Sequence, residues 1–537
     1  MKKIYIYDTT LRDGTQGEGI SFSSEDKLKV ARKLDQLGIT YIEGGWPGSN
    51  PKDMEFFKQA SKINFKNARL SAFGSTCRAF TDPAEDKNLT SLLESGAKVI
   101  AIFGKTWDFQ VIEALQTTLE ENLRMIRESI AYLKSHNLEV IFDAEHFFDG
   151  YKANPEYALA ALQAAEDGGA DWLTLCDTNG GSLPNEVTQI VSHVKSVLRT
   201  PLGIHAHNDS DLAVANSLAA IVAGAEQVQG TINGYGERCG NANLCSIIPN
   251  LQLKYGYDCI GELIKNLTEV SRYIDEIANV VQRANQPFVG KSAFSHKGGI
   301  HVSAILKNAK TYEHMEPETV GNQRRVVVSE LAGQSNLLFK AQELGIHVDK
   351  QHPQTKALIA EIKEMEHQGY QFEAAEASFE LLLRRAFSDI EDVISLDSFK
   401  MLIEKRGEQK VASDAIVKLN FNGNVHVTAA EGNGPVNALD NALRKILEDF
   451  YPDLKSMYLS DYKVRVIDEK DGTAAKIRVL IESSNGETSW STIGVSENVI
   501  EASWFALADS YRYALLGKED EAMIDRIQTE RKGILNH

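Results

Sequence analysis

The chain has 537 residues, and 57 lysines and arginines against 75 acidic residues give it a formal charge of −18. That length predicts two or three domains, and the acidic excess argues against sequence-independent binding to nucleic acid or to an anionic membrane, because both require a basic surface. The five cysteines include no Cys-x-x-Cys pair, and no segment approaches the roughly 20 apolar residues of a membrane helix. We therefore expect a globular cytoplasmic protein without a disulfide framework.

Short β-rich segments alternate with longer amphipathic helical segments through the first half of the chain. The expected helices include residues 25–37, 117–135, 155–167 and 212–222, and glycines stand where several helices in this half would end. Each helix leads within a few residues into the next strand. The expected strands cover residues 4–8, 41–44, 70–74, 99–104, 140–144, 172–177, 202–206 and 227–232.

Eight strand–helix units in roughly 285 residues predict a closed (β/α)8 barrel, which is typically about 250 residues long. An open doubly wound sheet has the same local pattern and is the alternative. The carboxyl ends of the expected strands carry polar or glycine residues, namely Asp8, Gly44, Gly104, Glu145, Asp177, His207 and Asn233. Convergent strand ends suit the mouth of a barrel better than a single crevice. We therefore predict an α/β protein with a barrel over residues 1–285.

The remainder of the chain divides into a helical part and a repeated part. Residues 286–403 have mainly helical periodicity, and the polar segment 404–413 is interpreted as a linker. Each half of residues 414–520 then alternates as a hairpin and continues as an amphipathic helix, over 436–450 and over 499–516. A two-fold β-β-α repeat of this size, without a convergent set of catalytic side chains, predicts a small regulatory or dimerising α+β domain.

The strongest local signal is the pair His205 and His207 at the end of the seventh expected strand. Residues i and i+2 of a strand point to the same side, so both imidazoles would project into the barrel mouth and could bind one cation. Asp13, beside Arg12 after the first strand, can complete a site of two histidines and one carboxylate, which suits a catalytic divalent metal. The alternatives are two hydrogen-bonded histidines that serve packing and an ordinary surface pair of Arg12 and Asp13.

A glycine-rich segment, residues 230–241, follows the eighth expected strand. Its G-x-G-x-x-x-G spacing differs from the dinucleotide-binding fingerprint, which should also open the first βα unit and not close the last. We interpret these glycines as positions where the backbone approaches the site closely. Asn241, at the end of the segment, is then a plausible further metal contact.

Together, the three motifs resemble those of the isopropylmalate, homocitrate and citramalate synthases, a family of metal-dependent barrel enzymes. Residues 8–16 match the first motif of that family, residues 205–208 the second and residues 230–241 the third. The resemblance covers nearly the whole chain, from the barrel through helical linker subdomains to a C-terminal module similar to the family's allosteric domain. It implies a Claisen condensation of acetyl-CoA with a 2-oxo acid, followed by hydrolysis of the thioester.

The resemblance also implies a role for individual residues in the barrel. The implied metal ligands are Asp13, His205, His207 and Asn241, and the ion would be Mn²⁺, Mg²⁺ or Zn²⁺. Arg12 looks like the residue that contacts the keto-acid oxygen, and Thr178 looks like a contact of the substrate carboxylate. The other residues expected at the substrate are Gln16, Asp143 and Phe103. Glu145 resembles the acid that the family carries on its fifth strand.

Beyond the barrel, His301 and Tyr312 resemble the residues that the family brings into the active site of a neighbouring subunit. This resemblance implies a homodimer in which each active site is completed in trans. His301, assisted by Tyr312, would remove a proton from the acetyl methyl group. Glu145 would either orient groups or take part in that proton transfer.

Two stretches, residues 46–53 and 103–109, look like the citramalate-synthase branch, which uses pyruvate and supplies isoleucine biosynthesis through 2-oxobutyrate. Isopropylmalate synthases usually carry Gln-Asp where this chain has Val302 and Ser303, and Asp where it has His146. Those departures weigh against the alternative within the family, 2-isopropylmalate synthase in leucine biosynthesis. A non-catalytic branched-chain amino-acid sensor and a lyase that runs related acyl-CoA chemistry in reverse are alternatives of other classes. By resemblance, the C-terminal module would bind a branched-chain effector, which is isoleucine if citramalate is the product.

Overall fold

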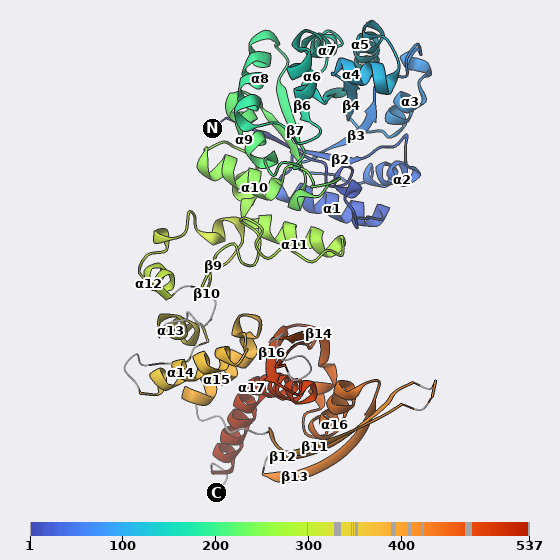
Figure 1. Ribbon diagram of the computed structural model, residues 1–537. Coiled ribbons are helices and arrows are strands. Elements are labelled where there is room, and N and C mark those ends of the chain that lie inside the picture. The colour runs from blue at the N-terminus through green and yellow to red at the C-terminus, as the bar shows by residue number, and fades with distance from the viewer. Residues whose placement is uncertain are drawn as a thin grey trace. The chain divides into compact units, whose positions relative to one another are not determined.

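The computed structural model of the chain divides into two compact units (Figure 1). One unit comprises Met1–Phe294 and Met315–Arg324, and the other comprises Ser295–His314 and Arg325–His537. The residues that the structure describes are 2–297, 299–326, 334–344, 346, 348, 353–387, 394–405, 407–408, 410–421, 423–467 and 475–534.

The first unit is built around a closed barrel of eight parallel strands in sequence order. Strand β1 pairs with β2 on one side and with β8 on the other, and this second pairing closes the sheet. The strands are β1 Tyr5–Asp8, β2 Tyr41–Gly45, β3 Arg69–Ser75, β4 Val99–Lys105, β5 Glu139–Glu145, β6 Trp172–Asp177, β7 Leu202–Ala206 and β8 Gln227–Gly230. The predicted barrel is therefore confirmed, and the open doubly wound sheet is excluded.

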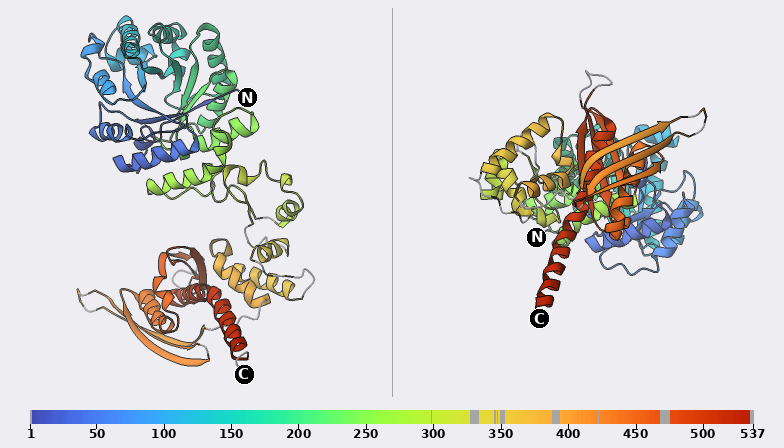
Figure 2. Two further views of the ribbon diagram at one scale, coloured as in Figure 1. Left: turned by 180° about the vertical axis from the view of Figure 1, so that it is seen from behind. Right: turned by 90° about the horizontal axis from the view of Figure 1, so that it is seen from below.

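Helices follow the strands and surround the barrel, as the views from opposite sides in Figures 1 and 2 show. They are α1 Ser24–Leu37, α2 Pro51–Ala60, α3 Lys87–Glu94, α4 Asp108–Gln110, α5 Leu119–Ser135, α6 Phe147–Ala153, α7 Pro155–Asp167, α8 Pro184–Val197, α9 Ala213–Ala223, α10 Leu244–Pro249 and α11 Leu267–Ile277. Local sequence sets these bounds. Ser23 and Asp26 form a reciprocal capping box at the start of α1, and Gly38 ends that helix with a φ of 89°.

The second unit starts with short elements and continues into helices. Its first part contains β9 Ser295–His296, α12 Gly299–Lys307, β10 Arg325–Val326, α13 Gln334–Glu343, α14 Pro353–His367 and α15 Glu376–Phe387. Strands β9 and β10 pair in parallel. Buried apolar side chains of α13, α14 and α15 share one core cluster, which explains their amphipathic periodicity.

The C-terminal part of the second unit is the expected two-fold repeat. The first copy is β11 Ile394–Glu404, β12 Ala412–Phe421, β13 Asn424–Gly432 and α16 Pro435–Phe450. The second copy is β14 Tyr458–Val466, β15 Ile477–Ser484, β16 Ser489–Ser496 and α17 Val499–Ile534. Each copy forms a three-stranded antiparallel sheet, so it has one strand more than the sequence predicted.

The strands that sequence patterns did not predict, β11 and β14, each contain a break in their pairing register. The register of β11 against β12 shifts between Leu396 and Ser398, and that of β14 against β15 shifts between Leu459 and Asp461. Such a bulge inserts a residue and breaks the period-two alternation by which a strand is recognised. The prediction of helical structure up to residue 403 is therefore wrong from Ile394 onward. The expected linker 404–413, of which residues 406 and 409 lie outside the described residues, overlaps two paired strands, because β11 ends at Glu404 and β12 begins at Ala412.

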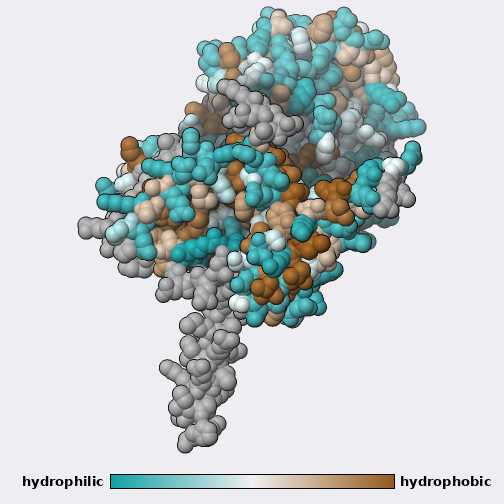
Figure 3. Space-filling model, turned by 60° about the horizontal axis from the view of Figure 1, so that its bottom comes forward, coloured by the Kyte–Doolittle hydropathy of each residue, from teal (hydrophilic) through white to brown (hydrophobic). Residues whose placement is uncertain are grey.

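The two faces of the β11–β12–β13 sheet differ in burial. Ala415, Val417, Leu419 and Phe421 are fully buried in a core that they share with α16. The opposite face of the same strands exposes Leu402, Ile416, Val425 and Val427. Brown, hydrophobic side chains gather on the side of the second unit that Figure 3 turns toward the viewer.

Within the described residues, no helix combines the length and apolar character needed to cross a bilayer.

Candidate active site

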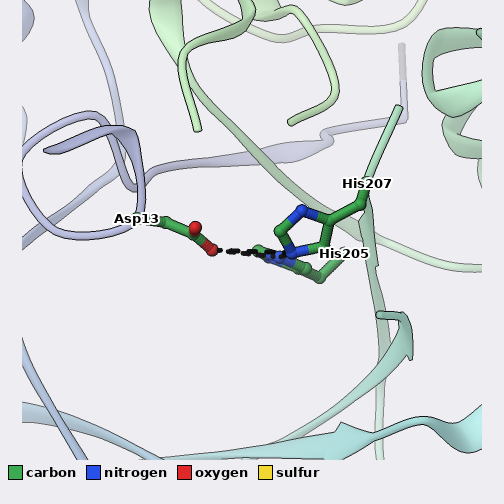
Figure 4. A group of neighbouring side chains, drawn as sticks. All are labelled: Asp13, His205 and His207. Carbon is green, nitrogen blue, oxygen red and sulfur yellow. Dashed lines mark hydrogen bonds and ion pairs between the residues drawn. The ribbon is translucent and has the colours of Figure 1, made fainter. Parts of the chain in front are cut away.

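Asp13, His205 and His207 meet at the barrel mouth, and Figure 4 shows the carboxylate aimed at the two imidazoles. The two Nε2 atoms are 3.3 Å apart. Oδ2 of Asp13 lies 3.3 Å from Nε2 of His205 and 3.9 Å from Nε2 of His207. Atoms that bind one ion at about 2.1 Å are separated from each other by about 3.0–3.4 Å. This spacing is close to that of three ligands of a single cation.

The protonation states of His207 and Asp13 suit a cation. For His205, burial lowers the pKa but contact with Asp13 raises it overall, and this imidazole must be neutral to bind a cation. Gln229 donates through Nε2 to Asp143 and therefore turns Oε1 toward Nδ1 of His205, 3.0 Å away, so that Nδ1 carries the hydrogen and Nε2 faces the cluster. Burial and the neighbouring His205 lower the pKa of His207 to about 4, which leaves its imidazole neutral. Burial opposes ionisation of Asp13, but Arg12 and the two histidines hold the pKa of this carboxyl well below its usual range.

Two buried side-chain oxygens have no hydrogen-bond partner in the part of the chain that the structure describes, and one of them belongs to a fourth residue that could bind the same cation. Oδ1 of Asp13 and Oδ1 of Asn241 have no hydrogen-bond partner among the described residues, although buried polar atoms are almost always paired. Asn241 pairs with His207 through an isolated backbone bridge, and its amide nitrogen donates to the carbonyl of Tyr235 at 3.1 Å. Two imidazole nitrogens together with carboxylate and amide oxygens form a donor set that fits a divalent metal.

The glycine-rich segment that carries Asn241 does bring backbone close to the site. A Cβ on Gly236 would lie 2.2 Å from the side-chain nitrogen of Asn241, and one on Gly240 would lie 2.0 Å from the carbonyl oxygen of Gly234. Both glycines also have positive φ values, 152° and 91°. Only glycine fits these two positions, and this permits the loop to fold tightly beside β7.

Arg12 is held beside the Asp13–His205–His207 cluster by three contacts. Its Nε donates to Oε2 of the fully buried Glu43 at 2.6 Å, and its Nη1 lies 3.3 Å from Oδ2 of Asp13. Its guanidinium carbon lies 3.7 Å from the ring centroid of Phe73, a cation–π contact. Burial alone would lower the pKa of Arg12, but Glu43 and Asp13 raise it, so this residue is a permanent cation.

A cavity of about 240 Å³ opens in front of Arg12 and the cluster. It is lined by Arg12, Asp13, Gln16, Trp46, Phe73, Phe103, Asp143, Glu145, Cys176, Thr178, His205, His207, Glu237 and Arg238. All the barrel residues that the sequence singles out for the substrate therefore line one space. That volume suits a small ligand such as a short 2-oxo acid beside part of a second substrate.

Two polar side chains that line the cavity are each held by a residue that does not line it. Oγ1 of Thr178 accepts a hydrogen bond from the backbone nitrogen of His146 at 2.8 Å, which leaves the hydroxyl hydrogen free to donate to a ligand. Glu145 forms an ion pair with Lys105, which lies at the end of the neighbouring strand β4. The cavity thus offers a hydroxyl donor and a paired carboxylate in addition to Arg12.

His301 and Tyr312 lie in the second unit, where they contact each other. Their ring centroids are 4.2 Å apart with an interplanar angle of 30°. Both side chains are exposed. The pair is thus accessible to another molecule.

Sequence reasoning missed Glu43, Gln229 and Lys105. Glu43 and Gln229 are buried polar residues within strands, and such residues inside an apolar strand signal an internal contact that fixes another group. Lys105 directly follows a glycine at a strand end, the position at which a barrel presents functional groups. Their partners could not be read from sequence, because they depend on which strand ends meet.

Each of the three parts of the chain matches a known protein family. Residues 3–281 match the HMGL-like family, residues 288–370 match the homocitrate synthase post-HMGL domain-like family, and residues 373–515 match the LeuA allosteric (dimerisation) domain. The fold and the site thus define a barrel of the HMGL-like class that is joined to a LeuA-type regulatory domain.

Individual relatives narrow this class. The chain is 59% identical over 526 residues to the (R)-citramalate synthase of Aquifex aeolicus (strain VF5), in an alignment that covers 97% of this chain and 100% of that protein. It is 56% identical over 522 residues to the (R)-citramalate synthase of Geobacter sulfurreducens, with 97% and 99% covered. The 2-isopropylmalate synthase of Methanocaldococcus jannaschii is 30% identical over 96% of both chains. The chain belongs to the (R)-citramalate synthase family.

Proposed function

We propose that the protein condenses acetyl-CoA with pyruvate and hydrolyses the resulting thioester, with (R)-citramalate and free CoA as products. The observation that carries this proposal is the cavity in which the Asp13–His205–His207 cluster and Arg12 face one small space. Membership of the citramalate synthase family supports pyruvate as the 2-oxo acid. A non-catalytic sensor would need neither the cluster nor the buried cation.

The cavity can bind and polarise a 2-oxo acid. Asp13, His205, His207 and Asn241 would hold a divalent metal, which when bound supplies Lewis-acid polarisation of the ketone and a template for the substrate. Arg12 donates toward the oxygen on which negative charge develops as the ketone is attacked. Thr178 donates its free hydroxyl hydrogen to the carboxylate of the 2-oxo acid.

The acetyl methyl group must lose a proton before its carbon can attack the ketone. We assign this step to His301, with Tyr312 in ring contact to orient it. The exposure of both side chains in one chain suits donation to the active site of a second subunit. Glu145, neutralised by Lys105 at the cavity wall, orients groups or accepts a proton in the hydrolytic half of the reaction. Water then attacks the thioester carbonyl and CoA leaves as the thiol.

The C-terminal module supports a dimeric and regulated enzyme. Its match to the LeuA allosteric (dimerisation) domain supports pairing of two chains, as does the exposed apolar face formed by Leu402, Ile416, Val425 and Val427. We propose a homodimer and assign isoleucine as the effector, because it is the end product to which citramalate leads. Titration of activity with isoleucine, against valine and leucine as controls, tests this assignment.

Thiol release tests the reaction itself. The purified protein is mixed with acetyl-CoA and, in separate reactions, with pyruvate, 2-oxobutyrate, 2-oxoisovalerate and 2-oxoglutarate. We expect the highest kcat/KM with pyruvate, loss of activity after chelation, and recovery when Mn²⁺, Mg²⁺ or Zn²⁺ is returned. A preference for 2-oxoisovalerate would overturn the substrate, and thiol release with none of the four acids would overturn the proposed function.

A further inference from the structure

The cavity is polar along one arc of the barrel and aromatic along another. Its charged and hydrogen-bonding residues come from β5, the ends of β1, β6 and β7, and the loop after β8. By contrast, the aromatic residues come from the consecutive strands β2, β3 and β4: Trp46 follows β2, and Phe73 and Phe103 lie near the carboxyl ends of β3 and β4. Because the barrel is closed in strand order, these three rings occupy one continuous section of the mouth.

The three rings form a closed cluster. Phe73 and Phe103 are stacked, with centroids 5.5 Å apart and an interplanar angle of 19°. Trp46 meets both of them edge-on, at 5.7 Å and 85° from Phe73 and at 5.7 Å and 81° from Phe103. Offset-stacked and T-shaped pairs are the favoured arrangements of aromatic rings, so this wall resists rearrangement. Arg12 lies against the face of Phe73, which places the aromatic wall beside the residue that faces the ketone.

Trp46 is the most firmly anchored of the three rings. Its backbone nitrogen donates to Oδ2 of Asp53 at 2.9 Å, and its indole nitrogen donates to Oδ1 of Asn88 at 2.8 Å. The other carboxylate oxygen of Asp53 accepts from the buried Lys27, which also donates to the carbonyl of Gly44 at 3.0 Å. The residue is thus fixed through its main chain and through the far end of its side chain.

The polar groups leave one direction for the alkyl group of the substrate. Arg12, Thr178 and the metal cluster together take the ketone and the carboxylate of a 2-oxo acid. The remaining substituent on the keto carbon then faces away from them, toward the aromatic arc. A methyl group adds little volume there, whereas an isopropyl group must displace a ring that is held by the hydrogen bond of its indole nitrogen and by two ring contacts.

We propose that Trp46 determines the substrate specificity of the cavity by limiting the alkyl group of the 2-oxo acid to about the size of a methyl group. This inference rests on the proposed condensation of acetyl-CoA with a 2-oxo acid. It assigns to Trp46 a contact with the substrate and assigns to Asp53 and Asn88 the positioning of the indole. The chemical steps at Arg12 and the metal cluster are unaffected by this assignment.

The test replaces Trp46 by a smaller apolar residue and measures a ratio of substrates. For Trp46→Leu we expect the ratio of kcat/KM with 2-oxoisovalerate to kcat/KM with pyruvate to rise at least about 10-fold, since one or two methyl groups in an apolar pocket are discriminated by about 10- to 200-fold. For Trp46→Phe, which retains a ring, we expect a smaller rise in the ratio of kcat/KM with 2-oxobutyrate to kcat/KM with pyruvate. Trp107→Leu is the matched control, because Trp107 is in tilted ring contact with Phe109 and is not among the residues that line the cavity.

The outcomes separate this inference from the function on which it rests. A wild-type protein that releases no thiol with any 2-oxo acid overturns both. An active wild type with a folded Trp46→Leu variant whose ratio stays within about twofold of wild type overturns the role of Trp46 alone. If Trp46→Leu loses its cooperative thermal unfolding, the ratio for Trp46→Phe decides, and an unchanged ratio contradicts the proposal. An equal rise in Trp107→Leu also contradicts it.

Discussion

Arg12 and Glu43 form an ion pair inside the barrel mouth, in which Nε of the arginine donates to Oε2 of the glutamate at 2.6 Å. Glu43 is fully buried and also accepts hydrogen bonds from the hydroxyls of Tyr7 and Thr9. The carboxylate on β2 is therefore held by hydroxyls from β1 and from the residue that follows β1, and it in turn holds the guanidinium. Arg12 reaches the substrate cavity in a position that Glu43 determines.

Replacement of Glu43 by glutamine should therefore impair the chemical step. The glutamine side chain is neutral and places an amide nitrogen where an acceptor oxygen stood. Arg12 would therefore lose the nearer of its two charge partners and its fixed orientation, and would keep only Asp13. We expect kcat to fall about 100-fold, as for the loss of an oxyanion donor, with a smaller change in KM for acetyl-CoA. Steady-state thiol release measures both constants. Glu43→Asp, which keeps the charge, should recover part of the loss, and an unaltered kcat in Glu43→Gln would contradict the role of the pair.

Removal of the carboxylate from the cluster should remove the metal. Asp13→Asn keeps the shape of the side chain but loses its negative charge, and we expect the divalent metal that accompanies the purified protein to fall well below the roughly one equivalent expected for wild type. Elemental analysis by mass spectrometry measures this content without reference to activity. Asp209→Asn is the control, because Asp209 pairs with Arg238 and lies outside the cluster. Equal metal content in Asp13→Asn and wild type would contradict the site.

The buried Asp143 should make the metal-free protein less stable as the pH rises. Burial and the charge of Glu43 raise the pKa of Asp143 from 3.8 to about 6, so the folded state retains a proton that the unfolded state loses between these values. The free energy of unfolding then falls through that window and levels off above it. Asp143→Asn removes the ionisation, so its stability relative to wild type should increase by about 2–3 kcal/mol between pH 4 and pH 7. Urea unfolding of chelator-treated protein checks this, and a pH-independent difference would contradict it.

The buried pair of Lys27 and Asp53 should dominate the stability of the loop that carries Trp46. The two charged atoms are 2.5 Å apart, and Lys27 is only 2% exposed. Lys27→Met leaves a buried carboxylate without its cation, which typically costs about 3–5 kcal/mol. The double variant with Asp53→Asn should lose less, since no unpaired charge remains. Lys29→Met, which removes an exposed partner of Glu25, is the control and should not change the urea midpoint measurably.

The barrel can be predicted closely because its strands are short apolar runs, and because capping residues and glycines mark the ends of the helices between them. The repeat is recognisable from β12, β13, β15 and β16, but β11 and β14 escape prediction because a bulge in each strand disrupts the alternation of exposed and buried residues. Helices in the second unit are indicated by their amphipathic faces, whose burial one core cluster explains.

The candidate site is predictable where function depends on position within a strand. His205 and His207 are two residues apart at the end of β7, and Asp13 follows β1, so sequence spacing alone indicates that they could converge. The environment of Arg12 is not predictable, because Glu43 and Phe73 approach it from other strands and reach it only through the closed order of the barrel. The aromatic wall escapes prediction for the same reason. Phe103 is expected at the cavity, but its stacking on Phe73 depends on the pairing of β3 with β4.

The most direct measurement is the identity of the product formed from labelled substrates. The wild-type protein with its divalent metal is incubated with acetyl-CoA that carries ¹³C in the acetyl group and with unlabelled pyruvate. Mass spectrometry and chiral chromatography then identify the product. We expect (R)-citramalate that contains both labelled carbons, in a one-to-one ratio with released thiol. Thiol release without labelled citramalate, or faster formation of labelled 2-isopropylmalate in a parallel reaction with 2-oxoisovalerate in place of pyruvate, would contradict the proposed reaction.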